Sequence, residues 1–229
     1  MSKRNMQFLY GDRELLIRVG DLLSAPVDVI VNPANTGLSH GDGLAGQILE
    51  HAGEELQQES VQLIKEHGEL ESGMSVYTTA GRLPYKAVIH AVGPKQGEGH
   101  EQFKIEQAVS RSLKLCEINE WHSIAFPAIS TGIYNVPVDV CAQGFFRAIT
   151  SFWDARIETS PMRVLIYLSE PHFEAFFHAF RNEAIDTDES AENSVVDDSP
   201  TDNPEAGIVD IDELQIDSDD DDEINDWFK

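Results

Sequence analysis

Short apolar segments alternate with segments of helical periodicity along most of the chain. Apolar residues that alternate with polar ones, or that run almost continuously as in VDVIV and VLIYL, predict strands. Apolar residues three and four positions apart, bounded by glycine or proline, predict helices. The predicted strands are residues 6–10, 14–19, 27–31, 74–78, 87–92, 123–126 and 164–168. The predicted helices are residues 44–52, 54–67, 101–118, 137–153 and 171–181.

The order of these elements predicts an α/β fold. Strands that alternate with helices form a mostly parallel sheet that is covered by helices on both faces. The first two strands flank a short turn at Gly11 and Asp12, so they should add an antiparallel pair at one edge. We therefore expect a three-layer α/β/α domain over residues 1–182, with a mixed, mostly parallel central sheet.

The net charge of −25 is unevenly distributed along the chain. Residues 183–229 contain 19 acidic residues and one basic residue, whereas residues 1–182 contain 22 acidic and 15 basic residues. A segment so rich in Asp, Glu and Ser does not bury enough apolar surface to fold alone. The sequence therefore predicts a disordered acidic C-terminal tail over residues 183–229.

Several classes of function are disfavoured by composition. Binding to nucleic-acid phosphates needs clustered Lys and Arg, which are absent, and no apolar run approaches the roughly 20 residues of a membrane span. The N-terminus has no apolar signal segment, so we expect a cytoplasmic protein. Cys116 and Cys141 fall in predicted helices and indicate buried, reduced thiols. His40 and His90 have no third ligand at a recognisable spacing, so packing is favoured and no metal is expected.

Two loops rich in Gly, Ser and Thr each follow a buried strand and precede a helix. They are residues 32–46, NPANTGLSHGDGLAG, and residues 126–137, FPAISTGIYNVP. Ligands of α/β sheets collect at the carboxyl ends of the strands, where glycine allows a close approach and N–H groups favour anions. Neither loop contains Lys or Arg, and neither has the spacing of a Walker A loop or a GxGxxG fingerprint. The pair therefore predicts a site that binds a diphosphate through neutral backbone dipoles.

Five ordered motifs together resemble the macro domain family, whose members bind ADP-ribose. The motifs are GDLL (20–23), VDVIVNPAN (27–35), HGDGLAG (40–46), IHAVGP (89–94) and FPAISTGIY (126–134). All five lie between about Glu14 and Leu168, a region that makes up nearly the whole predicted folded part. The resemblance implies that ADP-ribose, free or attached to a protein, is the ligand, and that no cofactor is needed.

The resemblance also implies roles for particular residues. Asp21 should accept a hydrogen bond from the adenine amine, and Leu22 should form an apolar wall. A carboxylate after Gly20 could equally cap a turn, but its place in the GD motif favours the ligand role. Asn35 should reach the hydroxyls of the distal ribose, while Asn32 holds its loop together. The residues expected along the distal ribose and diphosphate are Gly41, Gly43, Leu44 and Ala45 on one side and Ser130, Thr131, Gly132, Ile133 and Tyr134 on the other. Phe173 is a candidate for stacking on adenine, and packing on a helix face explains it equally well.

Similarity to the family leaves two functions open. One hydrolytic branch has an Asp at the position of Ala45, whereas the HGxG(V/L)AG form is similar to viral macro domains and to tandem modules of animal ADP-ribosyltransferases. In that branch Asn35 and Tyr134 should support catalysis, and Asp42 could assist as a base or be an exposed turn residue. We favour a hydrolase that acts on ADP-ribosyl linkages to proteins or on O-acetyl-ADP-ribose. The alternative is a non-catalytic ADP-ribose reader that recruits partners through its acidic tail.

The end of the acidic tail has a pattern of its own. In residues 207–229, apolar residues interleave with acids, and Trp227 and Phe228 nearly close the chain. Apolar anchors among acids suit a groove rimmed by Arg or Lys, so this segment is predicted to dock a protein partner. The tip is similar in character to the acidic, Phe-ended tails of bacterial single-stranded-DNA-binding proteins. The other interpretation is a plain solubilising tail.

Overall fold

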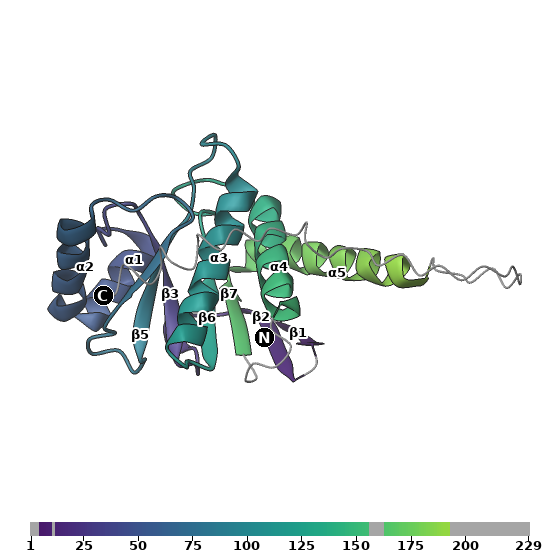
Figure 1. Ribbon diagram of the computed structural model, residues 1–229, viewed down its shortest axis with the longest axis horizontal. Helices are drawn as coiled ribbons and strands as arrows, with labels where there is room; N and C mark the ends of the chain where they lie inside the picture. Colours follow the sequence, from purple (N-terminus) through teal and green to yellow (C-terminus); the bar gives the residue numbers. More distant parts are fainter. Residues whose placement is uncertain (1–4, 11, 156–162, 193–229) are drawn as a thin grey trace, which may run out of the picture. The chain divides into compact units, whose positions relative to one another are not determined.

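The computed structural model describes residues 5–10, 12–155 and 163–192. The chain divides into two compact units, residues 1–182 and residues 183–229. The strands are β1 Asn5–Tyr10, β2 Arg13–Val19, β3 Val29–Ala34, β4 Ser75–Thr78, β5 Ala87–Val92, β6 Ser123–Pro127 and β7 Arg163–Leu168 (Figure 1). The helices are the 3-10 turn η1 Leu22–Ser24 and α1 Gly43–Ala52, α2 Glu54–His67, α3 Glu101–Ile118, α4 Val138–Asp154 and α5 Glu170–Glu192.

The described strands form one seven-stranded sheet in the order β1-β2-β7-β6-β3-β5-β4. The five central strands pair in parallel, and β1 and β4 pair antiparallel at the two edges. Because parallel strands end at the same edge, the loops after β3, β5, β6 and β7 lie together. β3 and β6 are direct neighbours, so the two glycine-containing loops follow adjacent strands.

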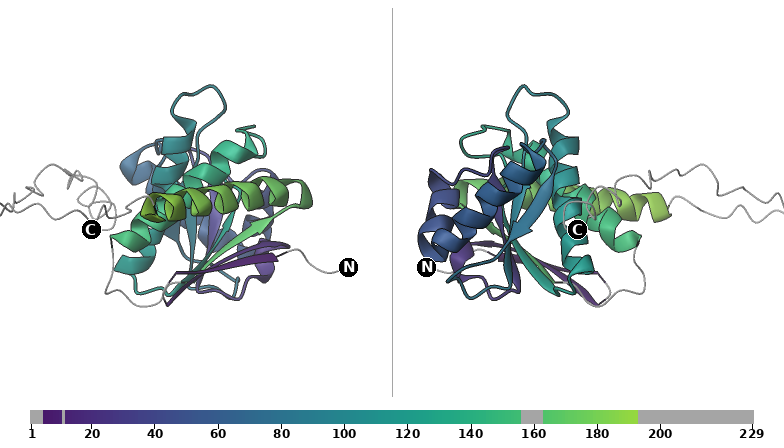
Figure 2. Two further views of the ribbon diagram at one scale, coloured as in Figure 1. Left: turned by 90° about the vertical axis from the view of Figure 1, so that its right-hand side faces the viewer. Right: turned by 60° about the vertical axis from the view of Figure 1, so that its left-hand side comes forward.

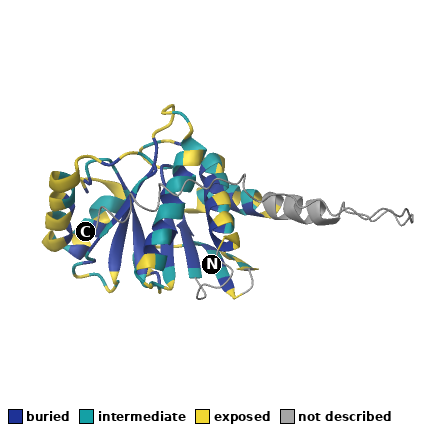
Figure 3. Cartoon of the chain, in the orientation of Figure 1, coloured by how far each residue is buried: buried dark blue, intermediate teal, exposed yellow. Residues whose placement is uncertain are grey.

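Two helical layers cover the sheet (Figure 2). On one face Ile30 of β3 packs with Ile48 of α1 and Leu56 of α2. On the other face Phe126 of β6 packs edge to face against Phe145 of α4, and α4 contacts α3 and α5 in turn. The central strands are buried almost throughout, whereas α2 exposes its outer side (Figure 3). This burial on both faces explains why these strands have continuous apolar sequences.

The predicted mixed, mostly parallel α/β/α fold is confirmed in the described residues, with local differences. β3 extends to Ala34, beyond the predicted end at Val31, because Asn32 and Pro33 continue the register with β5. The strand predicted at residues 74–78 is present as β4, but its antiparallel pairing at the second edge was not predicted, and neither was the short η1 turn. α5 continues to Glu192 instead of ending at Arg181, since no Gly or Pro follows Arg181 to stop it. No described helix is long and apolar enough to cross a membrane.

Candidate functional site

A cleft of about 560 Å³ opens at the carboxyl ends of β3, β6 and β7. A cavity of this size is in the range of ligand sites. Its lining from the first loop and the start of α1 is Pro33, Ala34, Asn35, Ser39, Gly41, Asp42, Gly43, Leu44 and Ala45. Its lining from the other strand ends is Gly93, Pro127, Ala128, Ile129, Ser130, Thr131, Gly132, Ile133, Tyr134, Tyr167, Leu168, Ser169 and His172. The two glycine-containing loops thus form opposite walls of one cleft.

The first wall is held at its start by the Asn35 side chain. Asn35 Nδ2 donates hydrogen bonds to the carbonyl oxygen and the hydroxyl of Ser39, both at 2.8 Å. Asn35 Oδ1 accepts from the Ser39 backbone N–H at 3.0 Å. An amide oxygen has two acceptor positions, so Oδ1 keeps one for a ligand hydroxyl. Asn35 therefore both closes its own loop and presents an acceptor to the cleft.

A buried network of neutral side chains supports the same wall from below. Asn32 Nδ2 lies 3.3 Å from His40 Nδ1 and 3.0 Å from His90 Nδ1. His40 Nε2 lies 2.9 Å from Ser60 Oγ, and His90 Nε2 lies 2.9 Å from Thr78 Oγ1. Both hydroxyls donate onward to backbone carbonyls. One assignment satisfies all these contacts, with Asn32 donating to each Nδ1 and each imidazole donating from Nε2.

That assignment requires both imidazoles to be uncharged. A proton added to either Nδ1 would face the Asn32 amide hydrogens instead of accepting from them. Burial lowers the pKa of His40, and burial together with the neighbouring His40 lowers the pKa of His90 to about 3. The network is therefore neutral at physiological pH. Asn32 Oδ1 is buried, and no described residue donates a hydrogen bond to it.

The first turn of α1 supplies backbone donors to the cleft. Intrahelical bonding begins with the Gly46 N–H, which donates to the Asp42 carbonyl. The N–H groups of Gly43, Leu44 and Ala45 precede that bond and have no acceptor within the helix. Asp42, the N-cap residue, does not cap them with its side chain. These N–H groups and the positive end of the helix dipole are suited to an anion.

The second wall is a tight turn around Ser130. Its carbonyl accepts from the Val136 N–H at 3.0 Å, and the Thr131 hydroxyl donates to the Ala128 carbonyl at 2.9 Å. Ser130 takes a φ of 66°, a left-handed conformation that costs about 1 kcal/mol or more in a non-glycine residue. Its hydroxyl is buried and has no hydrogen-bond partner among the described residues. The strained turn holds this hydroxyl in place against Gly93.

Gly93, directly after β5, lets the end of that strand approach the second wall closely. A Cβ at this position would lie 2.0 Å from Ser130 Oγ and 2.4 Å from Ile129 Cγ2, far inside contact distance. Only glycine therefore fits between β5 and the second loop. This explains the glycine of the IHAVGP motif by steric contact rather than by backbone conformation.

The cleft carries little charge. None of the described residues that line it is Lys or Arg, and the ionisable ones besides tyrosines are Asp42 and His172. Burial lowers the pKa of His172, which favours its neutral form. An anion bound here would be held by backbone N–H groups and the end of the α1 dipole.

Comparison with known proteins identifies the family. The profile of the Macro domain family matches residues 31–145, which contain both loops. An uncharacterized protein of Pyrobaculum aerophilum is 38% identical over 176 residues, which cover 77% of this chain and 96% of that protein. This chain belongs to the macro domain family.

Two further relatives have informative names. The O-acetyl-ADP-ribose deacetylase of Escherichia fergusonii is 43% identical over 135 residues, covering 58% of this chain and 76% of that protein. The Oceanobacillus iheyensis macrodomain with ADP is similar in structure, with a TM-score of 0.75 and 28% sequence identity. That match covers 81% of this chain and 100% of the other. The resemblance inferred from the sequence motifs is confirmed.

The macro domain brings most of the expected site residues together in the cleft. Those that line it are Asn35, Gly41, Asp42, Gly43, Leu44, Ala45, Ser130, Thr131, Gly132, Ile133 and Tyr134. Asp21 and Leu22 are not among the lining residues. The Asp21 carboxylate caps η1 by accepting from the Leu23 N–H at 3.0 Å, and Leu22 is buried in the core. The structure thus gives Asp21 the capping role that the sequence left open, and its contact with adenine remains a prediction.

The far end of the cleft contains residues that the sequence did not point to. Tyr167, at the end of β7, and His172, at the start of α5, line it. Phe173, the sequence candidate for stacking, is buried and stacks on Phe177. Packing on the helix face therefore accounts for Phe173, and its neighbour His172 faces the cleft instead.

Other candidate chemistry is absent from the described part of the chain. No group of three or more His, Cys, Asp or Glu there has the arrangement of a metal site. Cys116 and Cys141 are free and buried, and burial raises the pKa of both thiols. The sequence-based docking motif at residues 207–229 lies outside the described residues. We therefore base the proposed function on the cleft.

Proposed function

We propose that this macro domain binds ADP-ribose and hydrolyses ADP-ribosyl linkages, either to a modified protein or in O-acetyl-ADP-ribose. One observation carries the proposal. Two loops on adjacent parallel strands enclose a cleft of ligand size whose anion donors are backbone N–H groups. A diphosphate between two uncharged ends fits such a lining. The names of the Escherichia fergusonii and Oceanobacillus iheyensis relatives point to the same class of ligand.

The ligand is proposed to lie along the cleft with its diphosphate between the α1 N-terminus and Ser130. The adenine then lies toward Tyr167 and His172, which offer rings at that end. The distal ribose lies toward Asn35 and Tyr134. Burial and the negative charge of Glu98 raise the pKa of the Tyr134 phenol, so Tyr134 is a neutral hydrogen-bond donor.

The proposed reaction uses position and the charge of the substrate itself. In a modified protein, a water bound near the α-phosphate attacks the anomeric carbon of the distal ribose, and the bond from that carbon to the acceptor oxygen breaks, with the electron pair leaving on the acceptor. In O-acetyl-ADP-ribose the water attacks the acetyl carbonyl carbon instead, and the ester bond to the ribose oxygen breaks, which releases acetate. Positive charge that develops on the ribose is offset by the nearby diphosphate. Asn35 fixes the ribose through its free acceptor position, which keeps the water and the carbon in line. Asp42, which lines the cleft and is exposed, is the carboxylate placed to accept the proton of the water.

Calorimetric titration with ADP-ribose followed by a turnover assay tests the proposal. The wild type should bind ADP-ribose and release it from a mono-ADP-ribosylated protein. Asn35→Ala should lower kcat about a hundredfold with a smaller loss of affinity, since it removes a group that orients the reacting ribose. Undiminished turnover in this variant would end the catalytic assignment.

Ser39→Ala provides a matched comparison. It removes the hydroxyl that Asn35 contacts but leaves the Asn35 amide. If both variants lose turnover equally, Asn35 acts by holding the loop rather than by binding the ribose. A larger loss in Asn35→Ala supports a direct role.

The second candidate function is a non-catalytic reader of ADP-ribosylated proteins. It is favoured by the engagement of both Asn35 amide hydrogens with Ser39 and by Ala45, which supplies no carboxylate to the cleft. Both functions require ADP-ribose binding, so only turnover separates them. Tight binding with no product from either a modified protein or O-acetyl-ADP-ribose would establish the reader.

The acidic tail is proposed to dock a protein partner with a groove rimmed by Arg or Lys. The support is its sequence, in which apolar residues interleave with acids and Trp227 and Phe228 lie near the end. Replacing Trp227 and Phe228 together with Ala in the full chain leaves every acid in place. Partners captured by the wild type should be lost from this variant. An unchanged set of partners would leave only a solubilising tail.

A further inference from the structure

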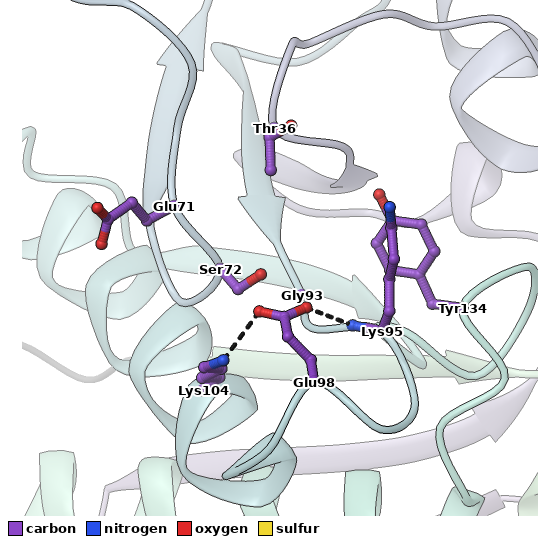
Figure 4. A pocket seen from close by; sticks show the side chains of 8 residues that line it. All are labelled: Thr36, Glu71, Ser72, Gly93, Lys95, Glu98, Lys104 and Tyr134. Carbon is purple, nitrogen blue, oxygen red and sulfur yellow. Dashed lines mark hydrogen bonds and ion pairs between the residues drawn. The ribbon is translucent and has the colours of Figure 1, made fainter.

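A second cavity adjoins the cleft and has a different kind of lining. Its volume is about 510 Å³, and it shares Gly93 and Tyr134 with the cleft. We call it the side pocket (Figure 4). Its other lining residues are Thr36, Glu71, Ser72, Lys95, Glu98 and Lys104. They come from the loops after β3, α2 and β5 and from the first turn of α3.

Two of its charges neutralise each other. Glu98 Oε1 lies 2.8 Å from Lys104 Nζ, and Glu98 Oε2 accepts from the Lys95 backbone N–H at 2.9 Å. Although partial burial opposes ionisation, hydrogen bonds from Lys104, Lys95 and Ser72 and the charge of Lys104 lower the pKa of Glu98 to about 2. Glu98 is thus charged at any physiological pH and is saturated by donors. It competes little for a ligand or for another lysine.

The ammonium group of Lys95 is not neutralised in this way. Lys95 Nζ lies over the Tyr134 ring, 5.4 Å from its centroid. Among the described residues no carboxylate forms an ion pair with it. Figure 4 shows the Lys95 side chain in front of the Tyr134 ring, with the Glu71 carboxylate directed away at the other end of the pocket. An available positive charge therefore lies where the side pocket meets the cleft.

We propose that the side pocket binds the polypeptide that flanks an ADP-ribosylated residue, with Lys95 holding a carboxylate of that flank. The inference rests on the proposed function, which places the distal ribose next to Tyr134. Whatever is attached to that ribose must continue past Tyr134, and the side pocket is the cavity that begins there. Its volume is far larger than an acetyl group needs and is in the range of sites for drug-sized ligands.

The chemistry of the lining favours an acidic flank. Lys95 offers its ammonium group. The hydroxyls of Thr36 and Ser72 donate hydrogen bonds to Glu69 and Glu98 and keep acceptor positions for the backbone N–H groups of a peptide. Of the two carboxylates that line the pocket, Glu98 is already paired with Lys104, and Glu71 lies at the end away from Lys95 and Tyr134. Lys95 is thereby a specificity residue for protein substrates, while O-acetyl-ADP-ribose leaves the side pocket empty.

The test compares three substrates that share the same ADP-ribose group. Two are mono-ADP-ribosylated peptides with one linkage, one flanked by Asp and Glu and the other by Asn and Gln, and the third is O-acetyl-ADP-ribose. KM is measured for each, or Kd where no turnover occurs. Lys95→Gln should raise the value for the acidic peptide about fivefold, as expected for a partly exposed ion pair, and Lys95→Arg should restore it. The neutral peptide, O-acetyl-ADP-ribose and free ADP-ribose should change less than about twofold.

Lys65→Gln is the control for net charge, because Lys65 is exposed on α2 and lines neither cavity. It should leave all values unchanged. An equal loss on every ligand in Lys95→Gln would mean that Lys95 only supports Tyr134, and the inference would be overturned. Equal affinity of the wild type for both peptides would overturn it as well. If the wild type fails to bind ADP-ribose itself, the proposed function fails instead.

Discussion

The cleft and the side pocket are neighbouring cavities of similar volume, yet different kinds of chemical group line them. The cleft is lined mainly by the loops that directly follow β3 and β6, with Tyr167 and His172 at the end of β7 and the start of α5, and none of its described lining residues is Lys or Arg. The side pocket is lined by Lys95, Glu98, Lys104 and Glu71. The cleft therefore presents fixed backbone dipoles to a ligand, and the side pocket presents charges on flexible side chains.

The difference indicates which part of a substrate each cavity suits. Backbone dipoles at strand ends are fixed by the sheet, so they hold a group whose geometry does not vary, such as a diphosphate. Long side chains adapt at small cost and suit a portion that varies from one substrate to the next. An invariant nucleotide and a variable acceptor match this division.

The largest effect is expected where the two cavities share a wall. Gly93→Ala places a Cβ 2.0 Å from Ser130 Oγ and 2.4 Å from Ile129 Cγ2, and Ile129 is buried. Overpacking of this kind should lower the free energy of unfolding by about 2 to 3 kcal/mol and abolish the close approach of the loops. Urea unfolding and calorimetric titration with ADP-ribose measure the two effects.

Gly132→Ala is the matched control for this prediction. A Cβ at Gly132 meets nothing within 4 Å. Its free energy of unfolding should stay within about 0.5 kcal/mol of the wild type. Equal stability of the Gly93 and Gly132 variants would show that β5 and the second loop are not tightly packed and that the loop can move to accommodate a Cβ at residue 93.

The buried histidine network beneath the cleft should lose stability in a pH range where the ion pair of the side pocket does not. The folded pKa of His90, about 3, lies below its ordinary value of 6.5. As the pH falls below 6.5 the unfolded state takes up the proton first, so stability present above 6.5 is progressively lost. At about 1.4 kcal/mol per pH unit, His90 alone should cost about 2 kcal/mol between pH 6.5 and pH 5. His40 and His172, whose pKa values are also lowered, act in the same direction.

Urea unfolding at pH 7, 6 and 5 measures this loss, and His90→Gln provides the comparison. Glutamine does not titrate, so the variant should lose less stability over that range, whatever its stability at pH 7. Carboxylates with lowered pKa values respond only below about pH 4.5 and do not obscure the result. Stability that is flat from pH 7 to pH 5 in the wild type would contradict the neutral network.

The sequence predicted the cleft better than the side pocket, for a physical reason. The cleft loops each follow a buried strand, and the position of a loop after a parallel strand fixes where it lies. The side-pocket residues come from three loops and a helix, and Lys95 and Glu98 are exposed loop residues without a periodic pattern. Their meeting depends on how long loops fold, which short-range patterns do not encode.

The spacing of the phenylalanines in α5 could have identified His172 as the residue that faces the cleft, but the preference for an aromatic ring pointed to Phe173. Aromatic chemistry pointed to Phe173, yet Phe173, Phe176, Phe177 and Phe180 have the spacing of one helix face. That face is the core side of α5, which leaves the preceding residue, His172, to face the cleft. Asp21 is different, because a single-turn 3-10 helix gives no periodicity by which its cap could be recognised.

The smallest effect is expected from the ion pair of the side pocket. The folded pKa of Glu98, about 2, lies below its ordinary value of 4.5, so its stabilisation is full above pH 4.5 and is lost as the pH falls toward 2. Because a third of the Glu98 side chain is exposed, solvent screening limits this contribution to about 1 kcal/mol. Glu98→Gln should therefore lower the free energy of unfolding by about 1 kcal/mol at pH 7 and make no difference near pH 2, as measured by urea unfolding at both values.

Since the uncharged amide would no longer neutralise Lys104, the Glu98→Gln variant should also bind an acidic peptide flank more tightly than the wild type. Weaker binding of the acidic flank by this variant would mean that Glu98 shapes the pocket and that charge is not what separates it from the cleft.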